Sequence, residues 1–491
     1  MKTVSTFYVE NFGCRATQAD GAAIERQFQE RGFVRADVST EAEFVVLNTC
    51  TVTAAADQDA RAAIRRVHRK NPNAQIVVTG CYAQRAPEEI AALPGVALVI
   101  GNSHKHRLAE LVTPDPPPRL PEMERAAAFP QRAAALNPSF LPISTLTSAD
   151  QKSGDQIFVS DIFAHTELLA APVFEAANER TRPNLKVQDG CGNRCSFCVI
   201  PSVRGNSRSL PRDRILEEVN ALVNAGYREV VISGINLGRW GRDLAQMGDF
   251  YQPMERRASG DLSRNSSQDK FEDLVRSILE ETPLEKLRIS SVEPMDWSDE
   301  LIHLMASSPR IAKHAHVPMQ SGSDTVLRRM HRKYRPWHYR EKIEKIRAAM
   351  PTAAIGADVM VGFPGESEAE FSETRRMVED LPFTYLHVFT YSARPGTAAA
   401  VLPNQVPAAV ARERNRILRE LAGGKKLAFM RKFLGSPVAA ITLNGHDDNH
   451  TESLTDNYLK LRLEGSHPAN RWISATIKHV EDGMMVGSLT Q

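Results

Sequence analysis

The pattern of apolar and polar residues first shows a segment in which strand-like and helix-like stretches alternate. Three short apolar runs occupy residues 6–9, 44–47 and 75–78, and stretches rich in Arg, Ala, Glu and Gln separate them. Apolar runs that alternate with stretches of helical composition predict parallel strands joined by crossover helices. We therefore expect an N-terminal αβα domain with a parallel sheet over residues 1–111.

The same alternation continues over a longer segment, which we expect to span residues 183–409. Six strand-like runs can be marked there, at residues 185–188, 229–233, 287–291, 314–319, 357–361 and 385–390. Helix-like stretches lie between them, for example at residues 214–225, 271–281 and 340–350. A βα series of about 210 residues has the size of a partial or full parallel barrel. The pattern predicts an α/β protein with a partial (β/α)6 barrel at its centre.

The remaining segments differ in character from these two. Residues 112–182 are rich in Pro, Ala and Ser and show no helical or strand period, so we interpret them as a linker. A polar, Gly- and Ser-rich stretch at 246–270 is typical of a surface insertion. Residues 410–436 form a basic, helix-like connection, in which positions 411–432 hold eight Lys or Arg and two Glu.

The tail, residues 437–491, has the pattern of a third domain. Short alternating runs occur at residues 438–442, 458–463, 472–477 and 484–486, and Gly, Asn and Asp turns separate them. Short, evenly spaced strands with turn residues between them predict a small antiparallel β barrel.

Composition narrows the class of protein. The formal net charge is only +2, with 42% hydrophobic and 24% charged residues, which is ordinary for a soluble globular chain. No stretch approaches the roughly 18 apolar residues of a membrane span, and the N-terminus has no apolar signal segment. Six cysteines in 491 residues are too few for a disulfide scaffold. We therefore expect a cytoplasmic protein with no membrane partner, in which clustered cysteines bind metal or do redox work.

The strongest chemical signal is a cysteine triplet just after the first strand of the expected barrel. It reads Cys191-Gly-Asn-Arg-Cys195-Ser-Phe-Cys198. Tetrahedral zinc normally takes a fourth ligand nearby, whereas a [4Fe–4S] cluster held by three cysteines leaves one iron open for another ligand. The spacing favours a catalytic cluster. A zinc knuckle completed by a distant residue, or a redox pair with a spare cysteine, are the alternatives.

The other three cysteines occupy equivalent places in three successive repeats. Cys14, Cys50 and Cys81 each follow an expected strand of the N-terminal sheet. Because the carboxyl ends of parallel strands lie at one edge, these cysteines are expected to converge there. Each one taken alone could be an ordinary buried cysteine. Together they predict a second three-cysteine cluster site.

These motifs resemble those of known enzymes. The triplet, with an aromatic residue before its last cysteine, resembles the signature of radical S-adenosylmethionine (SAM) enzymes. The chain as a whole resembles the radical SAM methylthiotransferases, and its tail resembles the RNA-binding TRAM domain. The motifs that carry the second resemblance are Asn11-Phe-Gly-Cys14, Asn48-Thr-Cys50-Thr-Val-Thr53, Thr79-Gly-Cys81-Tyr-Ala-Gln84, Lys186-Val-Gln-Asp-Gly-Cys191, Val317-Pro-Met-Gln-Ser-Gly-Ser-Asp324, Asp358-Val-Met-Val-Gly-Phe-Pro-Gly-Glu366 and Phe389-Thr-Tyr-Ser-Ala-Arg-Pro-Gly-Thr397.

The resemblance implies two [4Fe–4S] clusters with separate roles and SAM as the cofactor. The cluster on Cys191, Cys195 and Cys198 would reduce SAM to a radical that abstracts a hydrogen atom from the substrate. The cluster on the N-terminal cysteines would hold the sulfur that another SAM methylates. An electron donor such as flavodoxin or ferredoxin would supply the reducing electron. No residue stands out as a general base, and hydrogen abstraction by a radical does not require one.

Three branches of the family differ in what receives the methylthio group. The motifs around Cys50 and Cys81, with Gly101-Asn-Ser-His-Lys-His106, look most like the branch that acts on threonylcarbamoyladenosine in tRNA. The resemblance thus implies methylthiolation at carbon 2 of that adenosine, beside the anticodon. The alternatives are isopentenyladenosine in tRNA and an aspartate of a ribosomal protein. Outside enzymology, an iron–sulfur electron carrier or a zinc-dependent RNA-binding module remains open.

Strand ends of the barrel are where cofactor groups are expected. Phe197 is a candidate for stacking near the SAM adenine, or for simple packing, and Glu293 for accepting hydrogen bonds from SAM, or for a structural ion pair. Asp358 lies inside the fifth run, where a buried carboxylate needs a partner, so helix capping or a salt link is the alternative to cofactor contact. The full set of candidates is Phe197, Gly234, Asn236, Glu293, Gln320, Ser321 and Asp358.

Basic runs are candidates for RNA contacts, or else solvated helix faces. One run contains Arg328, Arg329, Arg332, Lys333 and Arg335, with Tyr334 and Trp337 among them, and another contains Arg61, Arg65, Arg66, Arg69 and Lys70. The tail itself has four Lys or Arg against seven Asp or Glu, a net charge of −3. RNA binding by the tail is therefore implied by the resemblance and not by its composition.

Overall fold

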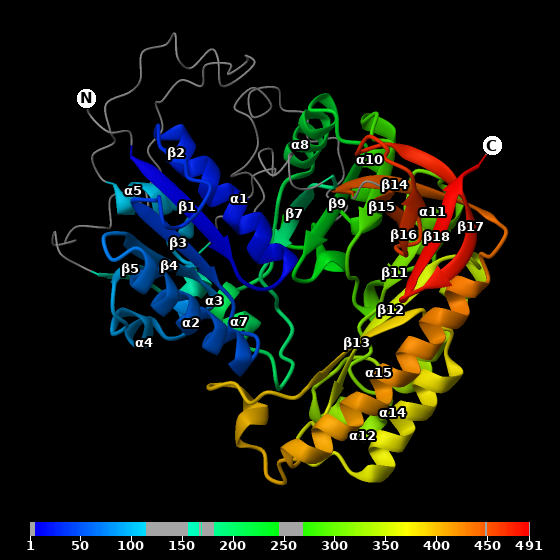
Figure 1. Ribbon diagram of the computed structural model, residues 1–491. Helices are drawn as coiled ribbons and strands as arrows, with labels where there is room; N and C mark the ends of the chain where they lie inside the picture. Colours follow the sequence, from blue (N-terminus) through cyan, green and yellow to red (C-terminus); the bar gives the residue numbers. More distant parts are fainter. Residues whose placement is uncertain are drawn as a thin grey trace, which may run out of the picture. The chain divides into compact units, whose positions relative to one another are not determined.

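The computed structural model describes residues 5–113, 156–165, 168, 181–244, 269–446 and 449–490 (Figure 1). The chain divides into two compact units, one made of residues 1–51 and 55–165 and the other of residues 52–54 and 166–491. Nearly all of the expected insertion at 246–270 and most of the expected linker lie outside the described residues. The domain boundaries expected at 111, 182, 409 and 436 stay predictions.

The first unit is built on a six-stranded sheet in which every pair of neighbouring strands is parallel. The strands, in spatial order, are β2 (Val34–Arg35), β1 (Thr6–Asn11), β3 (Phe44–Thr49), β4 (Gln75–Gly80), β5 (Val96–Gly101) and β6 (Ile157–Phe158). The helices are α1 (Arg15–Glu30), α2 (Ala54–Lys70), α3 (Cys81–Arg85), α4 (Pro87–Ala91) and α5 (Leu108–Val112). The expected parallel sheet is confirmed.

Burial explains why these strands read as apolar runs. Every residue of β3 is buried, because a parallel sheet is covered by helices on both faces. The sequence pattern did not reveal β6, which pairs with β5 at the sheet edge and lies in the expected linker. Its two residues, Ile157 and Phe158, are too short a signal to stand out from a loop.

The second unit contains an open barrel of six parallel strands. Two hydrogen-bonded sheets, β10-β9-β7-β8 and β11-β12-β13, are joined by parallel bridges between Leu287 and Ile311 and between Ser291 and His316. The strands are β7 (Asn184–Asp189), β9 (Glu229–Gly234), β10 (Lys286–Ile289), β11 (His314–His316), β12 (Ala354–Val361) and β13 (Tyr385–Thr390), with β8 (Arg208–Ser209) antiparallel at the edge. The expected partial (β/α)6 barrel is confirmed.

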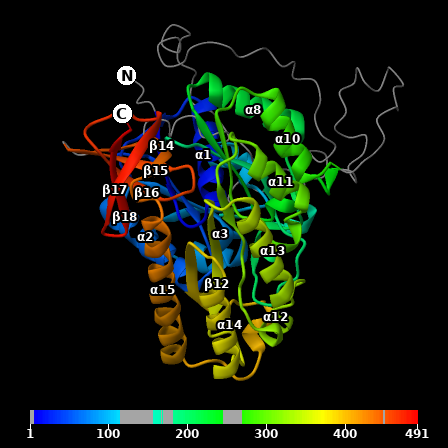
Figure 2. The ribbon, with the colours of Figure 1, turned by 90° about the vertical axis from the view of Figure 1, so that its right-hand side faces the viewer.

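Helices cover the outside of these strands. They are α7 (Ile200–Arg204), α8 (Arg212–Asn224), α10 (Phe271–Glu281), α11 (Asp299–Ser307), α12 (Asp324–Arg329), α13 (Pro336–Ala349), α14 (Glu368–Asp380) and α15 (Ala408–Arg431). Figure 2 shows α8, α10, α11 and α13 following one another along one side of the barrel. None of the helices in the described part of the chain combines the length and apolar character that a bilayer crossing needs.

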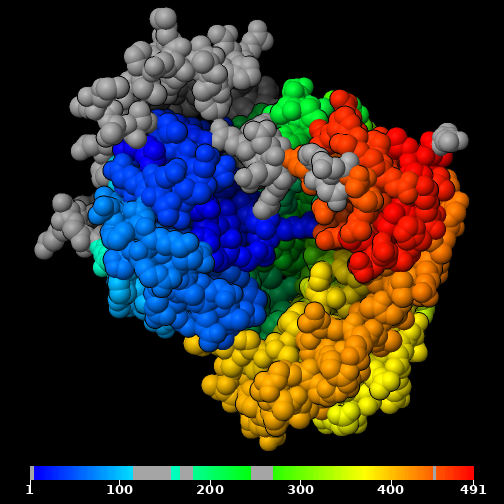
Figure 3. Space-filling model, in the orientation of Figure 1, coloured from blue at the N-terminus to red at the C-terminus, as the bar shows by residue number. Residues whose placement is uncertain are grey.

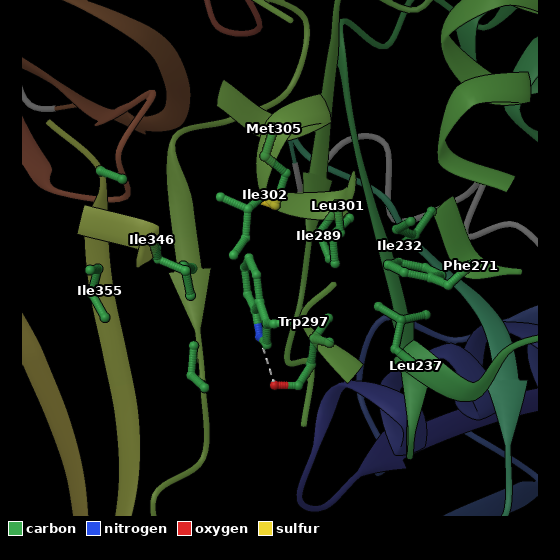
Figure 4. Packing of buried hydrophobic residues seen from close by; sticks show 14 of the residues in the cluster. Ile232, Leu237, Phe271, Ile289, Trp297, Leu301, Ile302, Met305, Ile346 and Ile355 are labelled. Carbon is green, nitrogen blue, oxygen red and sulfur yellow. Dashed lines mark hydrogen bonds between the residues drawn. The ribbon is translucent and has the colours of Figure 1, made fainter. Parts of the chain in front are cut away.

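The barrel core lies between the strands and these helices. Trp297 is fully buried at its centre, with Ile289, Leu301 and Ile302 close to the ring (Figure 4). Its indole Nε1 donates to the carbonyl of Val292 at 3.1 Å, so the ring's polar atom is satisfied inside an apolar core.

The tail folds into a closed barrel with strand order β14-β15-β16-β18-β17. The strands are β14 (Pro437–His446), β15 (His450–Thr455), β16 (Lys460–Glu464), β17 (Trp472–Glu481) and β18 (Met484–Leu489). The sequence pattern did not show β15, because its residues include a single large apolar side chain, Leu454. One pair, β16 with β18, is parallel and not antiparallel as expected. In the space-filling view the surface of this barrel continues into that of α15 (Figure 3).

Arg288, which forms a buried ion pair within the open barrel, also contacts the tail barrel of the second unit. Arg288 Nε lies 2.6 Å from Glu229 Oε1, and both side chains are almost completely inaccessible. Arg288 also donates Nη1 to the carbonyl of Asp456 in the tail at 3.1 Å, and its guanidinium lies 5.3 Å from the Tyr458 ring. Its carboxylate, carbonyl and ring partners together stabilise the buried cation, which fixes the tail barrel to the amino end of the strands.

Candidate active site

The loop that carries the cysteine triplet is closed by buried charges. Asp189, the last residue of β7, binds Arg204 at the end of α7 at 2.9 Å and Lys186 at 2.9 Å. Burial acts to raise the pKa of Asp189, but the charges of Arg204 and Lys186 outweigh it and hold the pKa well below its usual value. The loop from 190 to 203 is therefore held at both ends around an ionised carboxylate.

Gly190 and Gln188 shape the start of this loop. Gly190 has φ of +71°, and an added Cβ would lie 1.9 Å from the carbonyl oxygen of Asn206, so no other residue fits there. The Gln188 side chain donates to the carbonyl of Gly190 at 2.8 Å and accepts from the amide of Asn236 at 2.7 Å. Sequence reasoning did not single out Gln188 as a site residue, although it precedes the triplet by three positions.

The three thiols of the loop are close enough to influence one another. Burial, with a smaller contribution from the neighbouring Cys195 and Cys191, raises the pKa of the Cys198 thiol to about 12. Burial also raises the pKa of Cys191. A thiolate in this loop therefore needs a compensating positive centre, and bound metal supplies one. The three cysteines of this loop are therefore better suited to bind a metal cluster than to remain free thiols.

Arg332 connects this loop to Glu293. Its guanidinium is buried, donates Nη1 to Cys195 Sγ at 3.2 Å, and donates Nη2 to the Glu293 carboxylate. The predicted alternative for Glu293, a structural ion pair, is therefore present in the structure, and the ion pair lies beside a cysteine of the triplet. Sequence reasoning placed Arg332 in a basic run for RNA, because nothing in the run distinguishes a buried Arg from an exposed one.

Several buried polar atoms have no hydrogen-bond partner among the described residues, and three of them lie at or after the carboxyl ends of two barrel strands. They are Asn236 Oδ1, Gln320 Oε1 and Ser233 Oγ, which follow or end strands β9 and β11. Buried polar groups left unpaired by the protein indicate a ligand that pairs with them. Asn236 also directs Nδ2 toward Cys191 Sγ at 3.7 Å. These residues fit a small polar cofactor such as SAM beside the triplet.

The other expected cofactor residues lie in different surroundings. Phe197 packs against a small apolar cluster that includes Met330 and Phe363. The Ser321 hydroxyl is buried and is already paired with Thr374 at 3.1 Å. These contacts are those of packing, and cofactor contact by either residue stays a prediction.

Gly234 and Asp358 have clearer reasons for their positions. A Cβ on Gly234 would lie 2.8 Å from Gln188 Oε1, so the glycine permits the close approach of these two strands. Asp358 faces His316, with Oδ1 3.4 Å from Nε2, and His316 Nδ1 lies 2.9 Å from the Ser291 hydroxyl. The partner expected for Asp358 is therefore a histidine of the neighbouring strand.

In the first unit, the remaining cysteines follow β1, β3 and β4. Thr49 and Gly80 are register partners on β3 and β4, so Cys50 and Cys81 leave adjacent strands at the same level. Cys14 is the exposed N-cap of α1, and a Cβ on its neighbour Gly13 would lie 2.9 Å from Cys50 Sγ. The three cysteines therefore gather at one edge of the sheet, as predicted.

Neither triplet forms a ready site for one metal ion. In the ranges that the structure describes, no three His, Cys, Asp or Glu side chains converge closely enough to hold a single ion. A mononuclear zinc site needs its ligands about 2.0–2.3 Å from one centre. A cluster takes each thiolate on a different iron, so three more widely spaced cysteines suit it better.

The expected RNA contacts of the run from Arg328 to Arg335 are largely occupied within the protein. Arg328 and Arg335 pair with Asp324, and Arg329 pairs with Glu370. Tyr334 is fully buried, with its hydroxyl donating to the carbonyl of Met319 at 2.6 Å. The prediction of an RNA surface is therefore wrong for Arg332 and Tyr334, which are buried. RNA contact by the exposed Arg328 and Lys333 stays a prediction.

Comparison with known proteins agrees with this arrangement. Residues 6–101 match the Uncharacterized protein family UPF0004, and residues 185–378 match the Radical SAM superfamily. The second match spans β7 to α14 and contains the cysteine loop, Glu293 and Arg332.

Relatives match over almost the whole chain. A threonylcarbamoyladenosine tRNA methylthiotransferase, MtaB, of Bacillus subtilis is 33% identical over 94% of this chain and 91% of its own length. An MtaB of Aquifex aeolicus is 32% identical over 95% of this chain and 99% of its own. A tRNA-2-methylthio-N(6)-dimethylallyladenosine synthase of Mycobacteroides abscessus is 32% identical over 95% of this chain and 83% of its own.

A solved structure agrees with the fold. The radical S-adenosylmethionine methyltransferase TsrM of Kitasatospora setae has a TM-score of 0.51 and 14% identity, over 82% of this chain and 77% of that one. At that identity the likeness concerns the fold alone. On the strength of the full-length relatives and the family matches, this chain belongs to the radical SAM tRNA methylthiotransferases.

Proposed function

We propose that this enzyme adds a methylthio group to carbon 2 of N6-threonylcarbamoyladenosine beside the anticodon of tRNA. The observation that carries the proposal is the presence of two separate three-cysteine sets, one at the edge of the N-terminal sheet and one after the first strand of the open barrel. Several relatives of the chain are named for this substrate. Each set provides three thiol ligands and leaves a further coordination position for something other than protein.

In the second unit, we assign Cys191, Cys195 and Cys198 as ligands of a [4Fe–4S] cluster. When bound, this cluster and SAM supply the radical chemistry that removes the hydrogen from the adenine carbon. Asn236 and Gln320 present unpaired polar atoms that would orient SAM, and Arg332 neutralises charge at Cys195.

In the first unit, we assign Cys14, Cys50 and Cys81 as ligands of a second cluster. Cys14 is exposed, whereas Cys50 and Cys81 are buried. These residues would hold the cluster that carries the sulfur, and a SAM other than the one that is reduced would supply the methyl group. An electron donor such as flavodoxin or ferredoxin completes the proposal, and the cytoplasmic localisation expected from the sequence stays a prediction.

A second candidate substrate is N6-dimethylallyladenosine in tRNA, because two relatives at 32% and 33% identity carry that name. Nucleoside mass spectrometry of tRNA from cells with and without the gene separates the two. We expect the methylthio derivative of threonylcarbamoyladenosine to disappear with the gene and to return with the wild-type gene but not with Cys50→Ala. Loss of the dimethylallyl derivative, or of a modified ribosomal aspartate with tRNA unchanged, would overturn the assignment.

A further inference from the structure

A cavity of about 480 Å³ lies in the second unit where the tail barrel meets the open barrel. Its walls come from β13, from the residues just before β7, from α15 and from four strands of the tail. The volume is within the range of about 300–1,000 Å³ that small-molecule sites occupy. None of the residues assigned to the two cysteine sites lines it.

Positive charge concentrates at this cavity although the tail as a whole is acidic. Of the tail's four Lys and Arg, Lys460 and Arg462 line the cavity, and Arg471 and Lys478 do not. Arg182 and Lys426 add two more cations from outside the tail, and Glu452 is the one carboxylate among the described residues that line the cavity. The fold therefore gives this cavity a net positive lining, which favours an anionic ligand.

Two tyrosines provide flat surfaces in the same cavity. The rings of Tyr385 and Tyr458 lie 6.2 Å apart, and both are half-buried. The Tyr385 hydroxyl lies 2.6 Å from His314 Nε2, and the Tyr458 ring lies 5.3 Å from the Arg288 guanidinium. Because other side chains hold the rings in place, the surfaces are formed before a ligand arrives. An aromatic surface beside cations is the arrangement that binds an unstacked base and its phosphates.

The cavity is at the opposite end of the barrel strands from the cysteine loop. Arg182 precedes β7 and Cys191 follows it, and Tyr385 is the first residue of β13. A strand of six residues is roughly 20 Å long. A nucleotide in the cavity is therefore not the nucleotide that reacts beside the cysteine loop.

We propose that this cavity binds one unpaired nucleotide of the RNA substrate, other than the modified adenosine. The base lies against Tyr458 or Tyr385, and the adjoining phosphates are bound by Lys460 and Arg462. This inference rests on the proposed function for the identity of the RNA. The tail as a whole is acidic, which disfavours RNA binding, but this positively charged cavity gives it one specific place to bind RNA.

The four tail cations offer a matched test. The full-length enzyme carrying Lys460→Ala and Arg462→Ala is compared with the same enzyme carrying Arg471→Ala and Lys478→Ala, which has the same net charge. Binding of a fluorescent anticodon stem-loop is measured by anisotropy at several salt concentrations. We expect about tenfold weaker binding by the first variant, and a slope of log affinity against log salt that is smaller by about 1.4, since each single-strand phosphate contact contributes about 0.7. The second variant should bind like wild type.

Two outcomes overturn the inference. Equal loss in both double variants would show a general electrostatic effect, and unchanged binding in both would show that the cavity does not bind RNA. Tyr458→Phe, which keeps the ring, should bind normally, whereas Tyr458→Leu should bind about tenfold more weakly. Methylthiolation of the RNA by the wild-type enzyme is measured separately. If wild type forms the product but the first variant binds RNA normally, this inference alone is wrong. If wild type forms no product but the first variant binds RNA more weakly as expected, the proposed function alone is wrong.

Discussion

Arg332 Nη1 donates to Cys195 Sγ at 3.2 Å while Nη2 of the same guanidinium binds the Glu293 carboxylate. The arginine therefore links Glu293, which follows β10, to the cysteine loop. Since a buried cation beside a thiolate stabilises added negative charge, Arg332 is placed to influence the electron affinity of whatever metal the triplet holds.

Replacing Arg332 by Met should lower the reduction potential of the cluster on the Cys191 loop. The substitution removes both the cation and the hydrogen bond to sulfur, so the reduced form loses more stabilisation than the oxidised form. We expect cleavage of SAM to slow by about tenfold or more, the usual loss on removing a group that supports metal ligands. A redox titration followed by electron paramagnetic resonance measures the potential, with the exposed neighbour variant Lys333→Met as control. An unchanged potential would show that Arg332 only fills space.

Single cysteine variants should separate the two cluster sites. Cys195→Ala should keep the N-terminal cluster and abolish formation of 5′-deoxyadenosine from SAM. Cys50→Ala should keep some SAM cleavage and abolish the methylthio product, because it removes only the sulfur-holding set. Iron, sulfide, 5′-deoxyadenosine and modified nucleoside are measured on the same preparations. Methylthio product from Cys50→Ala at the wild-type level would contradict the sulfur-holding role.

Breaking the buried pair of Arg288 and Glu229 should loosen the tail barrel. Arg288→Met leaves the buried Glu229 carboxylate with only its longer, 3.5 Å contact to Arg182, and the loss of a buried partner costs up to about 3–5 kcal/mol. The second variant, Arg288→Met with Glu229→Gln, should recover part of that free energy because the uncompensated charge is gone. Urea unfolding and limited proteolysis of the junction report the effect. Equal destabilisation by both variants would mean that the lost contacts to Asp456 and Tyr458, and not the stranded charge, dominate.

Acid should weaken the start of α14 through Glu370. Burial acts to raise the pKa of this carboxyl, but hydrogen bonds from Thr325 and Arg329 outweigh it and lower the pKa to about 2. A carboxyl with a lowered pKa in the folded state stabilises the fold above its unfolded value of about 4.3 and loses that effect as the pH falls toward 2. Glu370→Gln should therefore cost about 1 kcal/mol at pH 7 and progressively less below pH 4. Parallel unfolding curves of the two proteins at pH 7 and pH 3.5 test this, and a pH-independent difference would contradict it.

The fold was largely predictable because most of its strands are buried and therefore consist of consecutive apolar residues. In β3 and β9 nearly every residue is enclosed, so the apolar run and the strand coincide. β6 and β15 were not predictable, since neither has enough apolar residues to differ from a loop. Their pairing depends on neighbours distant in the sequence.

The site was predictable where spacing alone carries the chemistry, as in Cys191, Cys195 and Cys198. It was not predictable where the fold decides the environment. Arg332 and its sequence neighbour Lys333 look alike in the sequence, yet one is buried against Cys195 and the other is exposed. The same holds for Lys460 and Lys478, of which only the first lines the cavity beside Tyr458.

Product analysis with purified components shows which adenosine the enzyme methylthiolates. The anaerobically reconstituted enzyme is given SAM, a reductant, a sulfide source and two anticodon stem-loops in equal amount, one with threonylcarbamoyladenosine and one with dimethylallyladenosine. We expect methylthiolation of the first RNA and at least tenfold less of the second. Preferential methylthiolation of the dimethylallyl substrate, or cleavage of SAM with no methylthio product on either RNA, would contradict it.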